Sequence, residues 1–189
     1  PGFHFNTSPP MIVGNTAIVG GFVLDNMATN APSGVVRAFD ALSGQQLWSW
    51  DAGLPDPNEA FGPDGGYARG SPNVWSLMSA DEKLGLVYLP TGNPSPDYFG
   101  GQRSPQMERY GSAVVALEAA TGKLRWSFQT VRHDLWDYDV ASQPVLVDLP
   151  IDGRTVPALV MGTKQGEIFM FDRRNGQALG PIKEIQVPK

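Results

Sequence analysis

The chain has 189 residues, a net charge of -5 and no cysteine, and 41% of its residues are hydrophobic. This is enough to bury a core, and the length suits one domain or part of a larger one. Clustered lysine and arginine are missing, so we expect no nucleic-acid partner, and disulfides and thiolate metal sites are excluded within the chain. No apolar run approaches the roughly 18 residues of a membrane span, and no signal peptide is visible. The chain opens on PGFHFNTSPP, without an initiator Met or a clear element, so we expect a piece of a longer protein.

The first predicted elements are a hairpin and a unit that later repeats. MIVGNTAIVGG is typical of two short strands joined by a Gly-Asn turn. GVVRAFDALSGQQLWSW, from Gly34, predicts an alternating strand, a glycine-containing turn and a second strand. The unit recurs as SAVVALEAATGKLRWSF from Ser112 and, in shorter form, as GEIFMFDRRNGQAL from Gly166. In the first two copies a tryptophan, Trp48 or Trp126, stands four residues after the turn glycine.

A further apolar strand precedes the second and third units, as LGLVYLPTG and PALVMGT. No stretch has a sustained 3.6-residue apolar period with caps, so no helix is predicted. Repeated short strands of this kind indicate an all-β fold with the units as blades of a β-propeller. Three blades are fewer than the roughly four to eight of a closed ring, and an open β-sandwich is the alternative. The insertion DAGLPDPNEAFGPDGGYARGSPN is expected to lie on one face and help build a site.

The octapeptide RHDLWDYD, residues 132–139, crowds three carboxylates, one imidazole and two large aromatic side chains together. A solvated loop would explain the carboxylates but not the aromatic residues between them. The wall of an active site would explain both, so the octapeptide is the first candidate for chemistry.

Four segments, in this order, carry a resemblance to a known family: RAFDALSGQQLW, YLPTGNPSPD, HDLWDYD and DRRNG. Together they resemble the quinoprotein dehydrogenases, which are eight-bladed propellers that hold pyrroloquinoline quinone (PQQ) and a divalent cation on the central axis. The chain is most similar to the membrane-bound glucose dehydrogenase branch, which includes quinate-type enzymes. The resemblance covers residues 1–189 and implies a partial catalytic propeller domain of about three blades.

The resemblance implies a role for one acid of the octapeptide. Asp137 matches the family's catalytic base, which must be ionised and within reach of the substrate hydroxyl; a turn-capping carboxylate is the alternative. Asp134 and Asp139 lack such a match and are interpreted as structural or supporting groups. His133 is either a packing residue or a ligand.

Three other residues match positions at the cofactor. Lys164, in GTKQG, matches the cation at the quinone carbonyls, where an ammonium would stabilise developing negative charge; a surface lysine is the alternative. Trp75 matches the aromatic floor on which the flat quinone stacks, whereas Trp48 and Trp126 are interpreted as blade-docking residues. Thr7 matches a threonine that hydrogen-bonds the cofactor.

The divalent cation, calcium or magnesium, prefers oxygen ligands such as those of Asp and Asn. The resemblance implicates the pair Asp25 and Asn26, for which a plain Asx turn is the alternative. In the loop TGNPS, the alcohol-oxidising relatives favour Asn93 and the glucose branch favours Ser95. Both are retained as candidate ligands of the cation, and Asn93 is favoured because an amide carbonyl is the better oxygen ligand.

The family's chemistry predicts oxidation of a sugar or cyclic polyol, as in conversion of glucose to gluconolactone, with hydride transfer to PQQ and electrons passed on to ubiquinone. It also predicts a periplasmic location at the inner membrane, with the membrane anchor outside this chain. Two alternatives remain open. One is a non-catalytic, Trp-docked propeller scaffold of the cell envelope, and the other is a PQQ alcohol dehydrogenase.

Overall fold

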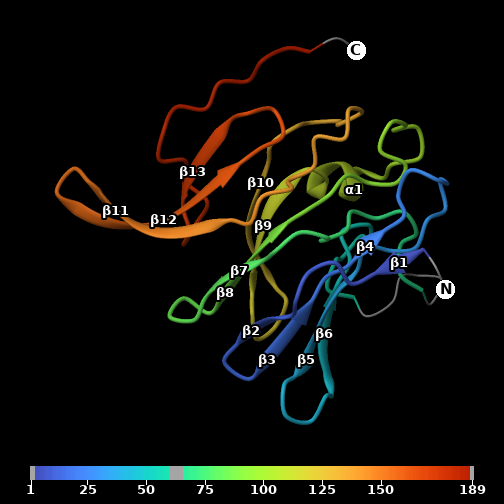
Figure 1. Cartoon of the computed structure of the whole chain (residues 1–189), viewed down its shortest axis with the longest axis horizontal. Coiled ribbons are helices and arrows are strands. Elements are labelled where there is room, and N and C mark those ends of the chain that lie inside the picture. The colour runs from blue at the N-terminus through green and yellow to red at the C-terminus, as the bar shows by residue number, and fades with distance from the viewer. Residues whose placement is uncertain (1–2, 60–65, 188–189) are drawn as a thin grey trace.

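The computed structural model describes residues 3–59 and 66–187, and part of the predicted insertion, residues 60–65, lies outside them. The secondary structure of the described chain consists almost entirely of antiparallel strands, joined by long loops (Figure 1). The strands are β1 (His4–Phe5), β2 (Met11–Val13), β3 (Thr16–Val19), β4 (Phe22–Val23), β5 (Val36–Asp40), β6 (Gln46–Trp50), β7 (Ser79–Asp81), β8 (Leu86–Pro90), β9 (Ala113–Glu118), β10 (Leu124–Gln129), β11 (Val145–Ile151), β12 (Arg154–Gly162) and β13 (Ile168–Asp172). They form two four-stranded sheets, one three-stranded sheet and the small pair β1–β4.

Each predicted repeat lies in a sheet of its own. The first sheet has the order β2-β3-β5-β6, the second β7-β8-β9-β10 and the third β11-β12-β13. Most paired strands follow one another along the chain, except that β4 leaves the first sheet to pair with β1 and β3 pairs with β5. The predicted Gly-Asn turn joins β2 to β3, where Val13 pairs with Thr16. The strand and hairpin predictions for the three units are therefore confirmed.

The second sheet is buried on both faces because it lies between the other two. Alternate residues of β8 point to opposite cores: Val87 and Leu89 pack with the first sheet, and Leu86 and Tyr88 pack with the third. All five residues of β8 are buried. A strand with no solvent face cannot alternate apolar with polar residues, which explains the continuous apolar run in LVYLP.

The tryptophans of the repeats dock one sheet on the next. The indole of Trp48 donates to the carbonyl of Ala119 at 3.0 Å, and its ring lies against Gly122, where an added Cβ would stand 2.7 Å from the indole Cδ2. Trp126 lies in the same way against Gly176 of the third sheet. Only glycine leaves room for the indole, so the interpretation of both tryptophans as docking residues is confirmed.

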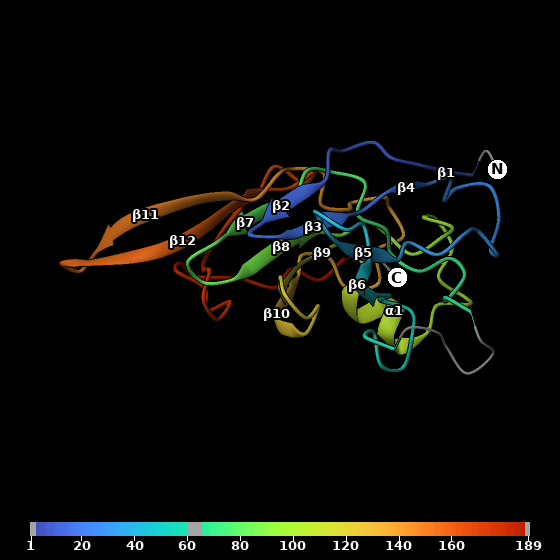
Figure 2. The same ribbon diagram turned by 90° about the horizontal axis from the view of Figure 1, so that it is seen from below.

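The third sheet differs from the other two. Its strands β11 and β12 form a long hairpin that projects from the rest of the molecule (Figures 1 and 2). In its repeat, Gly180 stands at the position of the docking tryptophan. Val145 and Ile168 on this sheet are 58% and 73% exposed.

The prediction of no helix is wrong for six residues. The helix α1 (Pro105–Tyr110) begins after Ser104, whose hydroxyl accepts the backbone N–H of Met107 at 3.2 Å. Proline at the first helical position needs no hydrogen-bond partner there. The helix is too short to display a 3.6-residue pattern, so only the capping serine and the proline signal it. In the described part of the chain, no helix has the length and apolar character needed to cross a membrane.

Candidate active site

The octapeptide 132–139 folds around one buried carboxylate. Asp134 is 2% exposed and accepts the backbone N–H of Trp136 at 2.9 Å, the N–H of Tyr138 at 2.7 Å and the hydroxyl of Ser112 at 2.6 Å. These bonds fix the turn in which Asp137 adopts a φ of 61°. Asp134 is therefore a structural residue that determines where Asp137 points.

Asp137, Asp139 and Lys164 form one ion-pair cluster between the second and third sheets. The Lys164 Nζ lies 3.0 Å from Asp137 Oδ1, 3.0 Å from Asp139 Oδ1 and 2.8 Å from the Asp137 carbonyl. Asp139 also accepts the indole N–H of Trp75 at 2.7 Å. The Thr7 hydroxyl in turn donates to the backbone carbonyl of Trp75 at 2.6 Å. Four residues that are far apart in the sequence are thus connected by consecutive hydrogen bonds.

The pKa values of the two acids of this cluster are shifted in opposite directions. Burial raises the pKa of Asp139 to about 7, because the buried charged form loses its hydration. Burial also acts on Asp137, but the hydrogen bonds from Asp139 and Lys164 outweigh it and lower the pKa of Asp137. Hydrogen bonds to the two acids raise the pKa of Lys164 despite its burial. Asp137 is therefore the acid of the pair that ionises at the lower pH, and a general base must be ionised at the working pH.

Two more carboxylates lie beside this cluster. Burial, followed by repulsion from Asp25, Asp137 and Asp139, raises the pKa of Asp97 to about 8. Burial also raises the pKa of Asp25, although the Asn73 amide donates to its Oδ2 at 3.1 Å. The region therefore holds several acids and a single nearby ammonium, so it is short of positive charge.

Unpartnered amide oxygens lie at the same place. Asn93 is 1% exposed and donates its amide N–H groups to the carbonyls of Asp97 and Asp134 at 3.1 and 3.0 Å, while its Oδ1 has no partner. Asn73, also 1% exposed, leaves its Oδ1 unpaired. A buried amide oxygen without a donor is costly, and a hard cation would satisfy it.

The other predicted cation ligands are placed less favourably. The Ser95 hydroxyl donates to the carbonyls of Asp25 and Ala28. Asn26 is exposed. Among residues 3–59 and 66–187, no three His, Asp or Glu side chains form a metal cage by themselves, so any cation here needs amide or hydroxyl oxygens as well.

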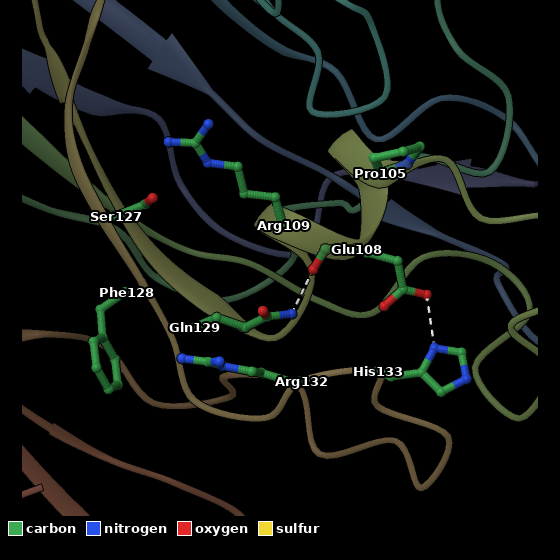
Figure 3. Close-up of a pocket in the computed structure, with 8 residues that line it drawn as sticks. All are labelled: Pro105, Glu108, Arg109, Ser127, Phe128, Gln129, Arg132 and His133. Atoms are coloured by element: carbon green, nitrogen blue, oxygen red, sulfur yellow. Dashed lines mark hydrogen bonds and ion pairs between the residues drawn. The ribbon is translucent and has the colours of Figure 1, made fainter. Parts of the chain in front are cut away.

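His133 lies outside the cluster of Asp137, Asp139 and Lys164, in a separate pocket. Its Nδ1 lies 3.0 Å from Glu108 Oε1, and the two side chains point toward each other in the pocket of Figure 3. The pocket lies beside α1 and β10 and contains none of the predicted cofactor or metal residues. It is lined by Pro105, Glu108, Arg109, Ser127, Phe128, Gln129, Arg132 and His133.

Known proteins have sequences and structures similar to those of this chain. All of residues 1–189 match the family described as the glucose/ethanol/alcohol dehydrogenase β-propeller domain of PQQ enzymes. The chain belongs to this PQQ β-propeller family. It is 47% identical over its whole length to a quinoprotein glucose dehydrogenase of Escherichia coli (strain K12) and 48% identical to a glycerol dehydrogenase large subunit of Gluconobacter oxydans (strain 621H). It is 44% identical over 96% of its length to a quinate/shikimate dehydrogenase (quinone) of Acinetobacter baylyi.

The chain spans about a quarter of the length of these relatives, from 23% to 25%. Among solved structures, it is similar to a europium-containing methanol dehydrogenase, with a TM-score of 0.76, 27% identity, and coverage of 94% of this chain and 33% of that one. A quinohemoprotein alcohol dehydrogenase from Comamonas testosteroni has a TM-score of 0.75, 26% identity, and coverage of 96% and 29%. The predicted propeller fold and the family resemblance are thereby confirmed.

The residues present fit the family's cofactor and cation. The indole of Trp75 is anchored at its N–H by Asp139, and a Cβ at Gly92 would lie 3.3 Å from its Cδ1, so glycine leaves the ring edge free. The ammonium of Lys164 lies two hydrogen bonds from this indole, through Asp139. A flat π-surface, an ammonium and unpartnered amide oxygens are the groups that a quinone with a bound cation requires.

Sequence reasoning did not find three residues of this region. Asp97 and Asn73 lack a recognisable motif, and their significance depends on burial, which the sequence does not reveal. The third is Arg103, whose guanidinium donates to the carbonyls of Asp97 and Asp134 at 3.0 and 2.6 Å. It joins the two loops that carry Asn93 and Asp137. The spacing of TGNPSPD was a usable signal for Asp97, since it lies four residues after Asn93.

Proposed function

We propose that this chain is part of the catalytic propeller domain of a PQQ-dependent dehydrogenase that oxidises a sugar or cyclic polyol. The observation that carries the proposal is the contact of Lys164 with Asp137 and Asp139, at 3.0 Å each, beside Trp75. It combines an ionised base, a fixed cation and a flat aromatic surface. A non-catalytic scaffold gives no reason to bury these acids together, because burying charge without function is costly.

The roles of the chain's own residues follow from their positions. Asp137, ionised at neutral pH, removes the proton of the substrate hydroxyl. Lys164 holds Asp137 in place and provides positive charge where negative charge develops. Trp75 and Thr7 would hold the quinone, and Asp25, Asn93 and Ser95, with Asn26 less favourably placed, would hold calcium or magnesium. PQQ, when bound, supplies the acceptor for the hydride of the substrate carbon.

The substrate class of the proposal is supported by the names of relatives, and its electron acceptor and location follow from the family resemblance. The names of the similar proteins include glucose, glycerol and quinate dehydrogenases, which supports a sugar or polyol substrate. In the proposed full-length protein, ubiquinone accepts the electrons, the catalytic domain faces the periplasm, and a membrane anchor outside this chain holds it at the inner membrane.

The test is Asp137→Asn in the full-length protein loaded with PQQ and calcium. Loss of a general base should lower turnover with glucose, quinate or glycerol by about 10²- to 10⁴-fold, while PQQ absorbance shows that the cofactor still binds. Asp152→Asn is the matched control, because Asp152 is an exposed hairpin residue with a φ of 49° that asparagine also tolerates. Near-normal turnover of Asp137→Asn would reject Asp137 as the base. Wild-type protein that fails to bind PQQ would reject the whole proposal.

A further inference from the structure

The carboxylate of Asp97 is buried without a partner. The residue is 4% exposed, and in the described parts of the chain no hydrogen bond or ion pair reaches its side-chain oxygens. Its electrostatic neighbours are three further acids, Asp25, Asp137 and Asp139, the ammonium of Lys164 and the guanidinium of Arg103. The charged form of a buried carboxylic acid that faces mainly other carboxylates is unfavourable unless a cation joins it.

The loop that carries Asp97 is held firmly. The Asp97 carbonyl accepts the Asn93 amide at 3.1 Å and the Arg103 guanidinium at 3.0 Å. Two residues earlier, the backbone N–H of Ser95 donates to the carbonyl of Gly70 at 2.9 Å. With its backbone fixed on both sides, the loop cannot easily carry the Asp97 carboxylate into solvent.

The available ammonium does not neutralise Asp97. Lys164 makes its ion pairs with Asp137 and Asp139, each at 3.0 Å, and makes none with Asp97. The guanidinium of Arg103 contacts the backbone carbonyl of Asp97 rather than its carboxylate. Both cations act on Asp97 electrostatically, but neither forms an ion pair with its carboxylate, so its charge is not fully compensated by these two side chains.

A second, independent observation points to a cation. The same short loop carries Asn93, whose Oδ1 is buried and unpartnered while its amide nitrogen is fully engaged. Hydrogen bonding thus fixes the orientation of the amide and leaves only its acceptor free. An amide oxygen without a hydrogen-bond donor and a carboxylate without an ion-pair partner are complementary to a hard cation and not to an anionic ligand.

We propose that Asp97 is a ligand of the divalent cation, together with the Asn93 carbonyl oxygen and Asp25. This inference rests on the proposed function, because it concerns the cation that accompanies the quinone. Calcium takes six to eight oxygens, so a third charged or amide donor from the chain is expected. Asp97 would bind the cation with a full negative charge, whereas the hydroxyl of Ser95 already donates to backbone carbonyls.

The experiment is a calcium titration of full-length, metal-stripped protein by isothermal titration calorimetry, with and without PQQ. Asp97→Asn keeps the shape of the side chain and removes its charge. The calcium Kd should rise by about tenfold or more for Asp97→Asn and for Asp25→Asn, and remain unchanged for Asp152→Asn. An unchanged Kd in Asp97→Asn, with a weakened one in Asp25→Asn, would overturn this inference and leave the proposed function standing. Wild-type protein that binds neither calcium nor PQQ would overturn both.

A second measurement separates ligation from a structural role. Without metal at pH 8, Asp97→Asn should melt at a higher temperature than wild type, because it removes repulsion among buried acids. With saturating calcium the order should reverse, because ligand binding stabilises wild type more. A metal-free Asp97→Asn protein that melts below wild type, or does not fold, would show that the carboxylate supports the loop, and would overturn the proposal.

Discussion

Replacing Gly122 by alanine should destabilise the protein more than the same replacement at Gly153. Both glycines have positive φ, 71° and 73°, so both variants incur the same backbone cost, about 1–2 kcal/mol. They differ in their surroundings. An alanine Cβ at Gly122 would lie 2.7 Å from the indole carbons of Trp48, whereas at Gly153 nothing lies within 4 Å.

The size of the difference follows from how tightly the indole is held. Trp48 is 8% exposed, and its Nε1 donates to the Ala119 carbonyl at 3.0 Å, so the ring cannot retreat without losing packing or that hydrogen bond. Forcing an extra methyl group into a packed site costs about 1–3 kcal/mol. Gly122→Ala should therefore lower the free energy of unfolding by about 2–5 kcal/mol in total, of which about 1–3 kcal/mol is absent from Gly153→Ala.

The assay is urea unfolding of the full-length variants, monitored by tryptophan fluorescence. The comparison requires equal m-values, the slopes of the unfolding free energy against urea concentration. Gly176→Ala, which meets Trp126 at 2.7 Å, should behave like Gly122→Ala. Equal losses of stability at Gly122 and Gly153, within a few tenths of a kcal/mol, would refute the conclusion that the indole docks one sheet on the next.

Two further predictions concern the acidic cluster. Lys164→Met should lower stability at pH 8 by about 1–3 kcal/mol and raise the pKa of Asp139 further, because Asp137 and Asp139 lose their common ammonium; unchanged urea unfolding would contradict this. The metal-free protein should lose stability as the pH rises from about 4 to 8. The pKa values of Asp97 and Asp139 are raised to about 8 and about 7, so the folded state binds more protons than the unfolded chain across that interval. His4, whose pKa is lowered by burial and by a nearby arginine, acts in the opposite sense below about pH 6.5. Melting temperatures that stay level or rise over this interval in the presence of a chelator would refute the expected sign.

Much of the fold could be predicted from the sequence because propeller units repeat local signals. The turn glycine marks the hairpin, and the tryptophan four residues after it marks the side chain that docks on the next sheet, as at Gly122 and Trp126. The helix α1 was missed because one and a half turns contain no periodic pattern. The long hairpin β11–β12 was only half predicted, since VLVDLPI has one proline and one acid that obscure its alternation.

The candidate site was predictable where a residue lies in a family motif. Asp137, Lys164, Trp75 and Asp25 lie in or beside one cluster. The spacing of TGNPSPD was a signal for the position of Asp97, but its burial among other acids was not predictable, because it depends on three loops whose proximity only the folded chain establishes.

Asp139 was interpreted as a supporting group, but its contacts with Lys164 and Trp75 place it at the centre of the cluster. A sequence gives the spacing of carboxylates, whereas it does not show which of them shares a cation or an indole with another loop.

The hydrogen-bonded series Thr7, Trp75, Asp139 and Lys164 has a mechanical consequence. The four residues come from segments that enter or leave the three sheets, so these hydrogen bonds depend on how the sheets are spaced. A shift of one blade against its neighbour would therefore move Asp137 relative to Lys164, even if the shift began at one of the docking tryptophans, Trp48 or Trp126. Tight packing between the blades, and not only the residues of the cluster, would therefore determine the alignment of Asp137 with Lys164 on which turnover would depend.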